Sequence, residues 1–66
     1  MPRVEVSGPP IDIERKRTLV REITKLIVDT YQVPASLAIV IIRENPPENI
    51  GIGGFLLADR PIEKGG

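Results

Sequence analysis

The sequence predicts a small α/β protein, a β-α-β subunit with two parallel strands, one helix and a C-terminal β-hairpin, which assembles into an oligomer. Three observations carry this prediction. Residues 3–6 alternate polar and apolar side chains, residues 13–31 repeat apolar side chains at helical spacing, and residues 37–42 are entirely apolar. A chain of 66 residues forms one domain, 1–66, in which residues 61–66 are expected to be a flexible tail.

The first predicted strand is the segment Arg3–Val6. Its period of two places Val4 and Val6 on one face, toward a core. The Gly8-Pro9-Pro10 sequence should end the strand, because proline has no amide hydrogen for a sheet and a fixed φ.

The predicted helix begins near Ile13 and ends by Tyr31 or Gln32. Asp12 is suited to cap its first turn, since a carboxylate accepts hydrogen bonds from free amides there. Pro34 disfavours helical geometry at the residue before it, so the helix cannot continue far beyond Tyr31. Apolar residues recur at steps of three and four on one side and charged residues occupy the others, which is typical of an amphipathic helix.

The second predicted strand is the apolar run Leu37–Ile42. It has no polar alternation, which indicates a strand that is buried on both faces. One helix covers only one face of a two-stranded sheet, so the other face needs a second copy of the chain. So small a domain is marginal alone, and the sequence has no Cys for a disulfide and no His for a typical zinc site.

After a loop over Asn45–Asn49, residues Ile50–Leu57 are predicted to form a short hairpin bent by glycines. The Gly51-Ile52-Gly53-Gly54 sequence lacks the spacing and the lysine of phosphate-binding loops. Glycine here more plausibly permits tight turns or the close approach of a neighbouring subunit.

Composition excludes several classes of function. Nine basic and nine acidic residues give a formal net charge of zero, and two aromatic residues are too few for a base-stacking platform, so nucleic acid is not expected as a partner. The longest apolar run is far shorter than the roughly 20 residues that cross a bilayer, so no membrane association is expected and a cytoplasmic location follows. We expect no metal and no cofactor.

Several segments together resemble the 4-oxalocrotonate tautomerase family in order and spacing, with one residue fewer before the helix. The resemblance covers Pro2 to about Leu56 and rests on Pro2 behind Met1 and on the segments 16–23 (KRTLVREI), 40–44 (VIIRE) and 51–54 (GIGG). It implies a tautomerase whose subunits join in dimers and then in a homohexamer. It also implies that Pro2, after removal of Met1, is the catalytic base and acid that moves a proton between the enol and keto forms of an unsaturated 2-hydroxy or 2-oxo acid, a small organic acid substrate. Enclosure in a pocket would disfavour the charged amine and move its pKa toward the operating pH.

The sequence departs from the family pattern at the substrate-binding positions. Ile11 and Ile39 stand where well-studied members carry arginines for the substrate carboxylates, and Ile50 aligns with an aromatic residue of the pocket. Arg43 is a candidate replacement, although it lies about 13 Å along the strand from Ile39. The candidate substrate-binding residues are therefore Ile39, Ile50 and Arg43, and a dicarboxylate is expected to bind poorly.

Arg3 and Arg60 are the other arginines that could replace the missing pair. Arg3 should point to the face opposite Pro2, and Arg60 lies near the tail, so for each a solvated or ion-paired role is favoured over a role in the site. The alternatives in function are a hydratase or dehalogenase of the same superfamily, or a non-catalytic oligomer that has lost the arginines.

Overall fold

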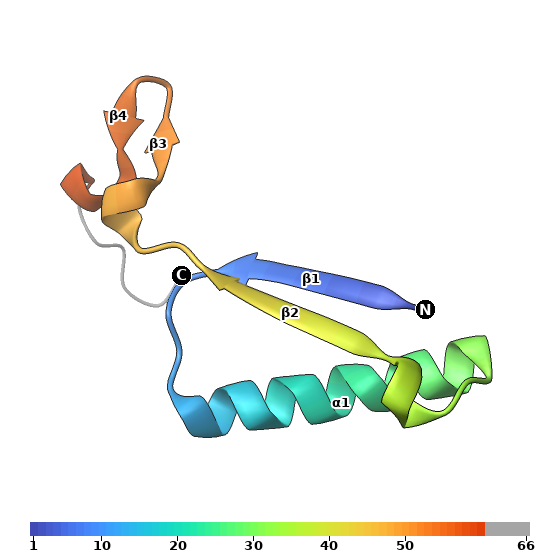
Figure 1. The fold of residues 1–66 in the computed structure, drawn as a ribbon. Helices are drawn as coiled ribbons and strands as arrows, with labels where there is room; N and C mark the ends of the chain where they lie inside the picture. The colour runs from blue at the N-terminus through green and yellow to red at the C-terminus, as the bar shows by residue number, and fades with distance from the viewer. Residues whose placement is uncertain (61–66) are drawn as a thin grey trace.

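The computed structural model describes residues 1–60 and confirms the predicted fold class (Figure 1). Strand β1 (Arg3–Gly8), helix α1 (Ile13–Tyr31) and strand β2 (Ile39–Glu44) form the β-α-β unit. Strands β3 (Gly51–Ile52) and β4 (Phe55–Leu56) form an antiparallel hairpin that projects beyond the end of β2. The predicted tail over residues 61–66 lies outside the described residues.

Strands β1 and β2 pair in parallel, with Val4 opposite Val40 and Val6 opposite Ile42. Because side chains alternate along a strand, these four residues share the face toward α1. Strand β1 continues two residues beyond the predicted end at Val6, and the Gly8 carbonyl accepts a hydrogen bond of 2.8 Å from the Asn45 amide.

Helix α1 has the predicted start and end. The Asp12 side chain accepts a hydrogen bond of 2.7 Å from the Arg15 amide, as expected of a helix cap. At the other end Gln32 adopts a left-handed conformation with φ of 56°, and its amide donates to the Val28 carbonyl at 2.9 Å. The turn before Pro34 therefore ends the helix without leaving the Val28 carbonyl unpaired.

The second strand begins at Ile39, and the prediction that it starts at Leu37 is wrong. Residues Ala35–Leu37 form a 3-10 turn, in which the Leu37 amide donates to the Pro34 carbonyl at 3.0 Å. The chain uses these residues to turn from the helix back to the sheet, and Leu37 is 39% exposed. An apolar side chain before a strand is thus no measure of where hydrogen bonding to the sheet begins.

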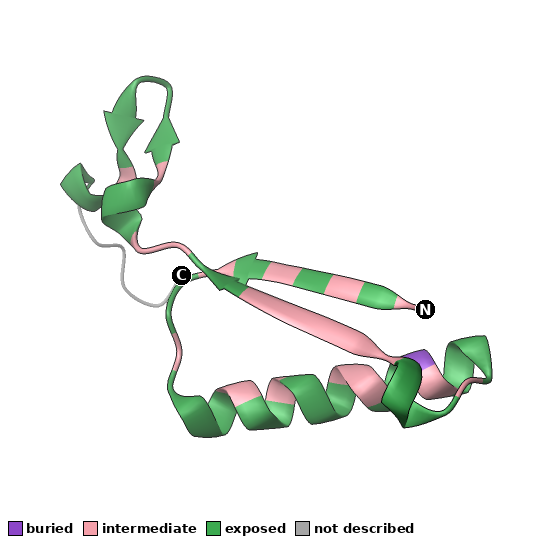
Figure 2. Cartoon of the chain, in the orientation of Figure 1, coloured by how far each residue is buried: buried purple, intermediate pink, exposed green. Residues whose placement is uncertain are grey.

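Burial within one chain is shallow (Figure 2). Ile27 is the only buried side chain among residues 1–60, at 4% exposure. Leu26 and Phe55 are 67% and 71% exposed. The outward face of the sheet, which carries Ile39 and Ile41, has no helix over it. Within residues 1–60, no helix has the length and apolar character needed to cross a bilayer.

Candidate active site

Pro2 lies directly before β1, at the edge of the β-α-β unit (Figure 1). It is half-buried, and its carbonyl accepts a hydrogen bond of 3.0 Å from the Ile39 amide. Met1, by contrast, is 82% exposed. The sheet therefore holds Pro2 in place, while Met1 projects into solvent.

Ile39 is brought to Pro2 by the register of the sheet. It is the first residue of β2, pairs with Arg3 and is half-buried. Its side chain belongs to the outward face together with Ile41, whereas alternation places Pro2 on the face toward the helix. Backbone contact thus joins the two residues while their side chains lie on opposite faces, and the Ile39 side chain offers no guanidinium to bind a carboxylate.

Arg43 shares the outward face with Ile39 but lies at the other end of β2, opposite Ser7. Its Nη2 and Nε donate to Glu5 Oε1 at 2.7 and 3.2 Å. Arg3 Nη2 also donates to Glu5 Oε1, at 3.3 Å. Arg43, followed by Arg3, lowers the pKa of the Glu5 carboxyl. In one chain both arginines are held by Glu5 and neither is presented to Pro2.

Ile50 follows the 3-10 turn Pro47–Asn49 that comes after β2. Its carbonyl accepts a hydrogen bond of 2.8 Å from the Leu57 amide, which ties together the base of the hairpin. This places Ile50 beyond the end of β2 that is remote from Pro2 (Figure 1). The single chain therefore brings Pro2 and Ile39 together but not Arg43 or Ile50, whose parts in substrate binding stay predictions.

The hairpin is an exposed apolar arm. Gly53 and Gly54 have φ of 61° and 89°, which lets the chain reverse between β3 and β4. Ile52 and Phe55 at its tip are 48% and 71% exposed. Neither side chain is covered by the β-α-β unit of its own chain, so the arm is available to a neighbouring subunit.

An ion pair that no sequence motif predicts joins α1 to the end of β2. Lys16 Nζ donates to Glu44 Oε1 at 2.8 Å, and the Ile11 amide donates to Glu44 Oε2 at 3.1 Å. These two hydrogen bonds, the Lys16 one first, lower the pKa of the Glu44 carboxyl. Because 28 residues separate Lys16 from Glu44, no local spacing pointed to the contact. The pair fixes Ile11, at the position where the family pattern has an arginine.

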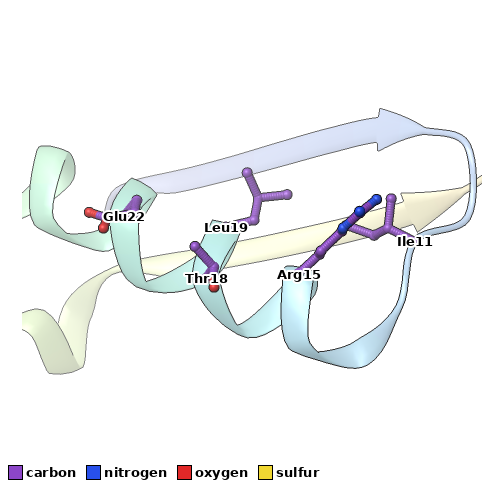
Figure 3. Close-up of a pocket in the computed structure, with 5 residues that line it drawn as sticks. All are labelled: Ile11, Arg15, Thr18, Leu19 and Glu22. Atoms are coloured by element: carbon purple, nitrogen blue, oxygen red, sulfur yellow. The ribbon is translucent and has the colours of Figure 1, made fainter.

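A second missed feature is an open groove along α1, lined by Ile11, Arg15, Thr18, Leu19 and Glu22 (Figure 3). Helical spacing alone predicts that Arg15, Thr18, Leu19 and Glu22 share a face, whereas Ile11 precedes the helix and joins them only through the fold. Within residues 1–60 there is no cluster of three or more acidic or other metal-ligating side chains.

Sequence comparisons relate this chain to known tautomerases. Residues 2–60 match a family model described as "Tautomerase enzyme". The chain is 32% identical over 57 residues to "Probable tautomerase K2" of Dickeya dadantii (strain 3937), a match that covers 86% of this chain and 85% of that protein.

Solved structures with the same fold include DmpI from Archaeoglobus fulgidus, which is 38% identical with a TM-score of 0.76. That match covers 88% of this chain and 100% of DmpI. The heterohexamer 4-oxalocrotonate tautomerase from Chloroflexus aurantiacus J-10-fl is 25% identical with a TM-score of 0.75, over 89% of this chain and 97% of that one. The family match over residues 2–60 spans the candidate base, the β-α-β unit and the hairpin.

Proposed function

We propose, because the chain belongs to the tautomerase family, that it is a tautomerase whose Pro2 moves a proton between the enol and keto forms of an unsaturated 2-hydroxy or 2-oxo acid. The observation that carries the proposal is the position of Pro2, half-buried before β1 and hydrogen-bonded through its carbonyl to the Ile39 amide at 3.0 Å. Removal of Met1 turns the Pro2 nitrogen from an amide into a secondary amine, which is basic in its neutral form.

In the proposed reaction, the neutral Pro2 amine takes the proton of the enol hydroxyl. The electron pair of that O–H bond forms the carbonyl, and the carbon–carbon double bond shifts its electrons to the terminal carbon. The resulting ammonium then delivers its proton to that carbon, so one proton moves and the amine is restored. General acid–base catalysis of this kind typically contributes about 10²- to 10⁴-fold to a rate.

The proposed substrate has one carboxylate and an apolar body. Ile39 lies beside Pro2, and Arg3 and Arg43 are already bound to Glu5. A site that offers no free guanidinium within its own chain provides poor binding for two carboxylates. We expect phenylenolpyruvate to be a better substrate than an unsaturated dicarboxylic acid.

We also propose that the protein works as a homohexamer in the cytoplasm. Support comes from the single buried side chain among residues 1–60, the uncovered Ile39 and Ile41, and the exposed Phe55 on the hairpin. A relative from Chloroflexus aurantiacus is itself described as a heterohexamer. In such an assembly a neighbouring chain would bring Ile50 or Arg43 to a Pro2 from which its own chain keeps them apart.

The test begins with mass spectrometry, which must find chains without Met1. Ketonisation of phenylenolpyruvate should then accelerate as the pH rises through the pKa of the Pro2 amine, because only the neutral amine accepts a proton. Pro2→Ala should slow the reaction substantially. A chain extended ahead of Pro2 should lose about 100-fold or more in kcat/KM, since its nitrogen is again an amide.

The matched control carries the same extension at the C-terminus and should keep the wild-type rate. If the N-terminal extension leaves the rate unchanged, Pro2 is not the base. An inactive chain with verified Pro2 terminus would favour a non-catalytic oligomer, an alternative supported by the isoleucines at positions 11 and 39. Release of halide, or addition of water to an unsaturated acid, would favour a dehalogenase or a hydratase.

A further inference from the structure

A hydrogen-bonded cluster lies where helix α1 meets the end of strand β2. Glu44 is the last residue of β2, and side-chain alternation places it on the same face as Val40 and Ile42, toward α1. Lys16 Nζ donates to Glu44 Oε1 at 2.8 Å, and the Ile11 amide donates to Glu44 Oε2 at 3.1 Å. Both carboxylate oxygens therefore tie the start of the helix to the end of the sheet.

The connection between β1 and α1, residues 9–12, is short of backbone donors. Pro9 and Pro10 have no amide hydrogen, so Ile11 carries the first donor of the connection. The acceptor of that donor is the Glu44 carboxylate, 33 residues away in sequence. One side chain thus fixes the connection and, through the ion pair, the first turn of α1.

The two halves of α1 are held on the sheet in different ways. In the second half, Ile27 is buried at 4% exposure. In the first half, residues 13–22, no side chain is buried, and only Lys16 and Leu19 are half-buried. Apolar burial therefore anchors the second half, whereas the first half has little of it and depends more on the ion pair to Glu44.

The Lys16–Glu44 pair is the least exposed ion pair within residues 1–60. Its side chains are 29% and 32% exposed, whereas those of the other five pairs are 44–77% exposed. Exposed pairs contribute little, but partial removal from water strengthens the attraction and reduces its screening by salt. The Ile11 amide adds a second hydrogen bond to the charged carboxylate, and bonds of that kind are stronger than neutral ones.

We propose that Glu44 is a positioning residue that holds the first half of α1 and the Ile11 side chain in place, and that this half opens locally when its contacts with Glu44 are lost. We call Glu44, Lys16 and the Ile11 amide together the Glu44 clamp. The groove of about 400 Å³ in Figure 3 depends on the clamp, because all its lining residues lie between positions 11 and 22. This role is independent of the chemistry proposed for Pro2.

The clamp is set by the charge of Glu44. Lys16 is the one charged side chain paired with Glu44 within residues 1–60, and Gly8, which stands opposite on β1, has no side chain. The other charged groups nearby pair among themselves, Arg43 with Glu5 on the opposite face of the sheet and Arg15 with Asp12 at the start of α1. The two donors of the clamp, Lys16 first, lower the pKa of the Glu44 carboxyl. The clamp is therefore complete above the unfolded value of about 4.5 and is lost as the pH falls through the lowered value.

The experiment measures amide hydrogen exchange by NMR in the full chain near neutral pH. The Ile11 and Lys16 amides report on the clamp, and the Gln32 and Ile39 amides report on the far end of α1 and on the sheet, since all four donate hydrogen bonds. Glu44→Gln should lower the protection of the first two amides about tenfold or more, because a carboxamide has one oxygen for two donors. Protection of the other two should stay within about twofold.

Two further variants of α1 separate the clamp from general effects on the helix. Lys16→Met removes one of the two bonds to Glu44 and should lower the protection of the Ile11 amide by less than Glu44→Gln does. Glu14→Gln is the matched control, because Glu14 pairs with Arg17 of its own helix, and it should leave the protection of all four amides within about twofold.

A pH titration of the wild type supplies a readout that needs no substitution. The Ile11 amide resonance should shift as Glu44 takes up a proton below about 4.5, while the Gln32 amide resonance stays in place. Equal protection of the Ile11 amide in wild type and Glu44→Gln overturns the proposal. An equal loss at all four amides also overturns it, because Glu44 would then hold the whole fold and not the first half of α1.

Discussion

Truncating Ile27 should cost more stability than truncating any exposed isoleucine of the helix, because it is the side chain on which α1 is packed, at 4% exposure. Ile27→Ala removes three carbon groups, and at about 0.8 kcal/mol each the lost transfer free energy is about 2.4 kcal/mol. The cavity left behind adds to this, so we expect a loss of about 3–4 kcal/mol in the free energy of unfolding. A loss of that size is a large share of the about 5–15 kcal/mol typical of whole domains.

The assay is urea unfolding followed by circular dichroism at several protein concentrations, since assembly contributes to apparent stability. Ile13→Ala is the matched control, because Ile13 is 58% exposed in the first turn of α1. It should cost less than about 1 kcal/mol, as little burial is lost and alanine favours the helix. Equal losses for the two variants, within about 0.5 kcal/mol, would refute the placement of the core at Ile27.

Three further predictions concern the end of the sheet, the hairpin and the uncovered face. The pKa of Glu44 is lowered in the folded chain by Lys16, so its contribution is present above the unfolded value of about 4.5 and is lost as the pH falls through the lowered value. The difference in Tm between wild type and Glu44→Gln should accordingly shrink in acid, and a difference unchanged from pH 7 to 3 would contradict this. Gly54→Ala should cost about 1–2 kcal/mol in unfolding experiments because φ at Gly54 is 89°; Gly51→Ala, whose added carbon would lie an ordinary 3.9 Å from the Phe55 carbonyl oxygen, should cost less. Ile41→Glu puts a charge on the uncovered face and should lower the mass measured by light scattering, whereas an unchanged mass would show that this face is not an interface.

The site shows where local sequence stops being informative. The family resemblance of the chain points to Pro2, and the sheet register explains why Pro2 is held beside Ile39. The same register separates Arg43 from Pro2 and commits its guanidinium to Glu5, 38 residues away in the chain. Contacts at that separation depend on how two strands align, which no spacing along the chain encodes.

The type and order of the helix and strands follow from local features of the chain. Helix α1 begins and ends where Asp12 and Pro34 predicted, because capping and proline geometry act within a few residues. The hydrophobic pattern of the sequence also predicted the order of strand, helix, strand and hairpin, because the period of apolar residues differs between helices and strands. The family can likewise be recognised from the sequence, because its motifs occur in order along the chain.

Packing between distant segments sets where β2 begins and how far β1 extends, and it brings Lys16 and Ile11 together at Glu44. Each depends on packing between segments that are far apart in sequence, where the geometry of the whole unit selects one hydrogen-bonding pattern among several that local preferences allow. The apolar run at residues 37–42 gives the clearest case. The apolar run correctly predicted a strand, but Leu37 and Ala38 precede β2 because the chain must first turn back from the helix.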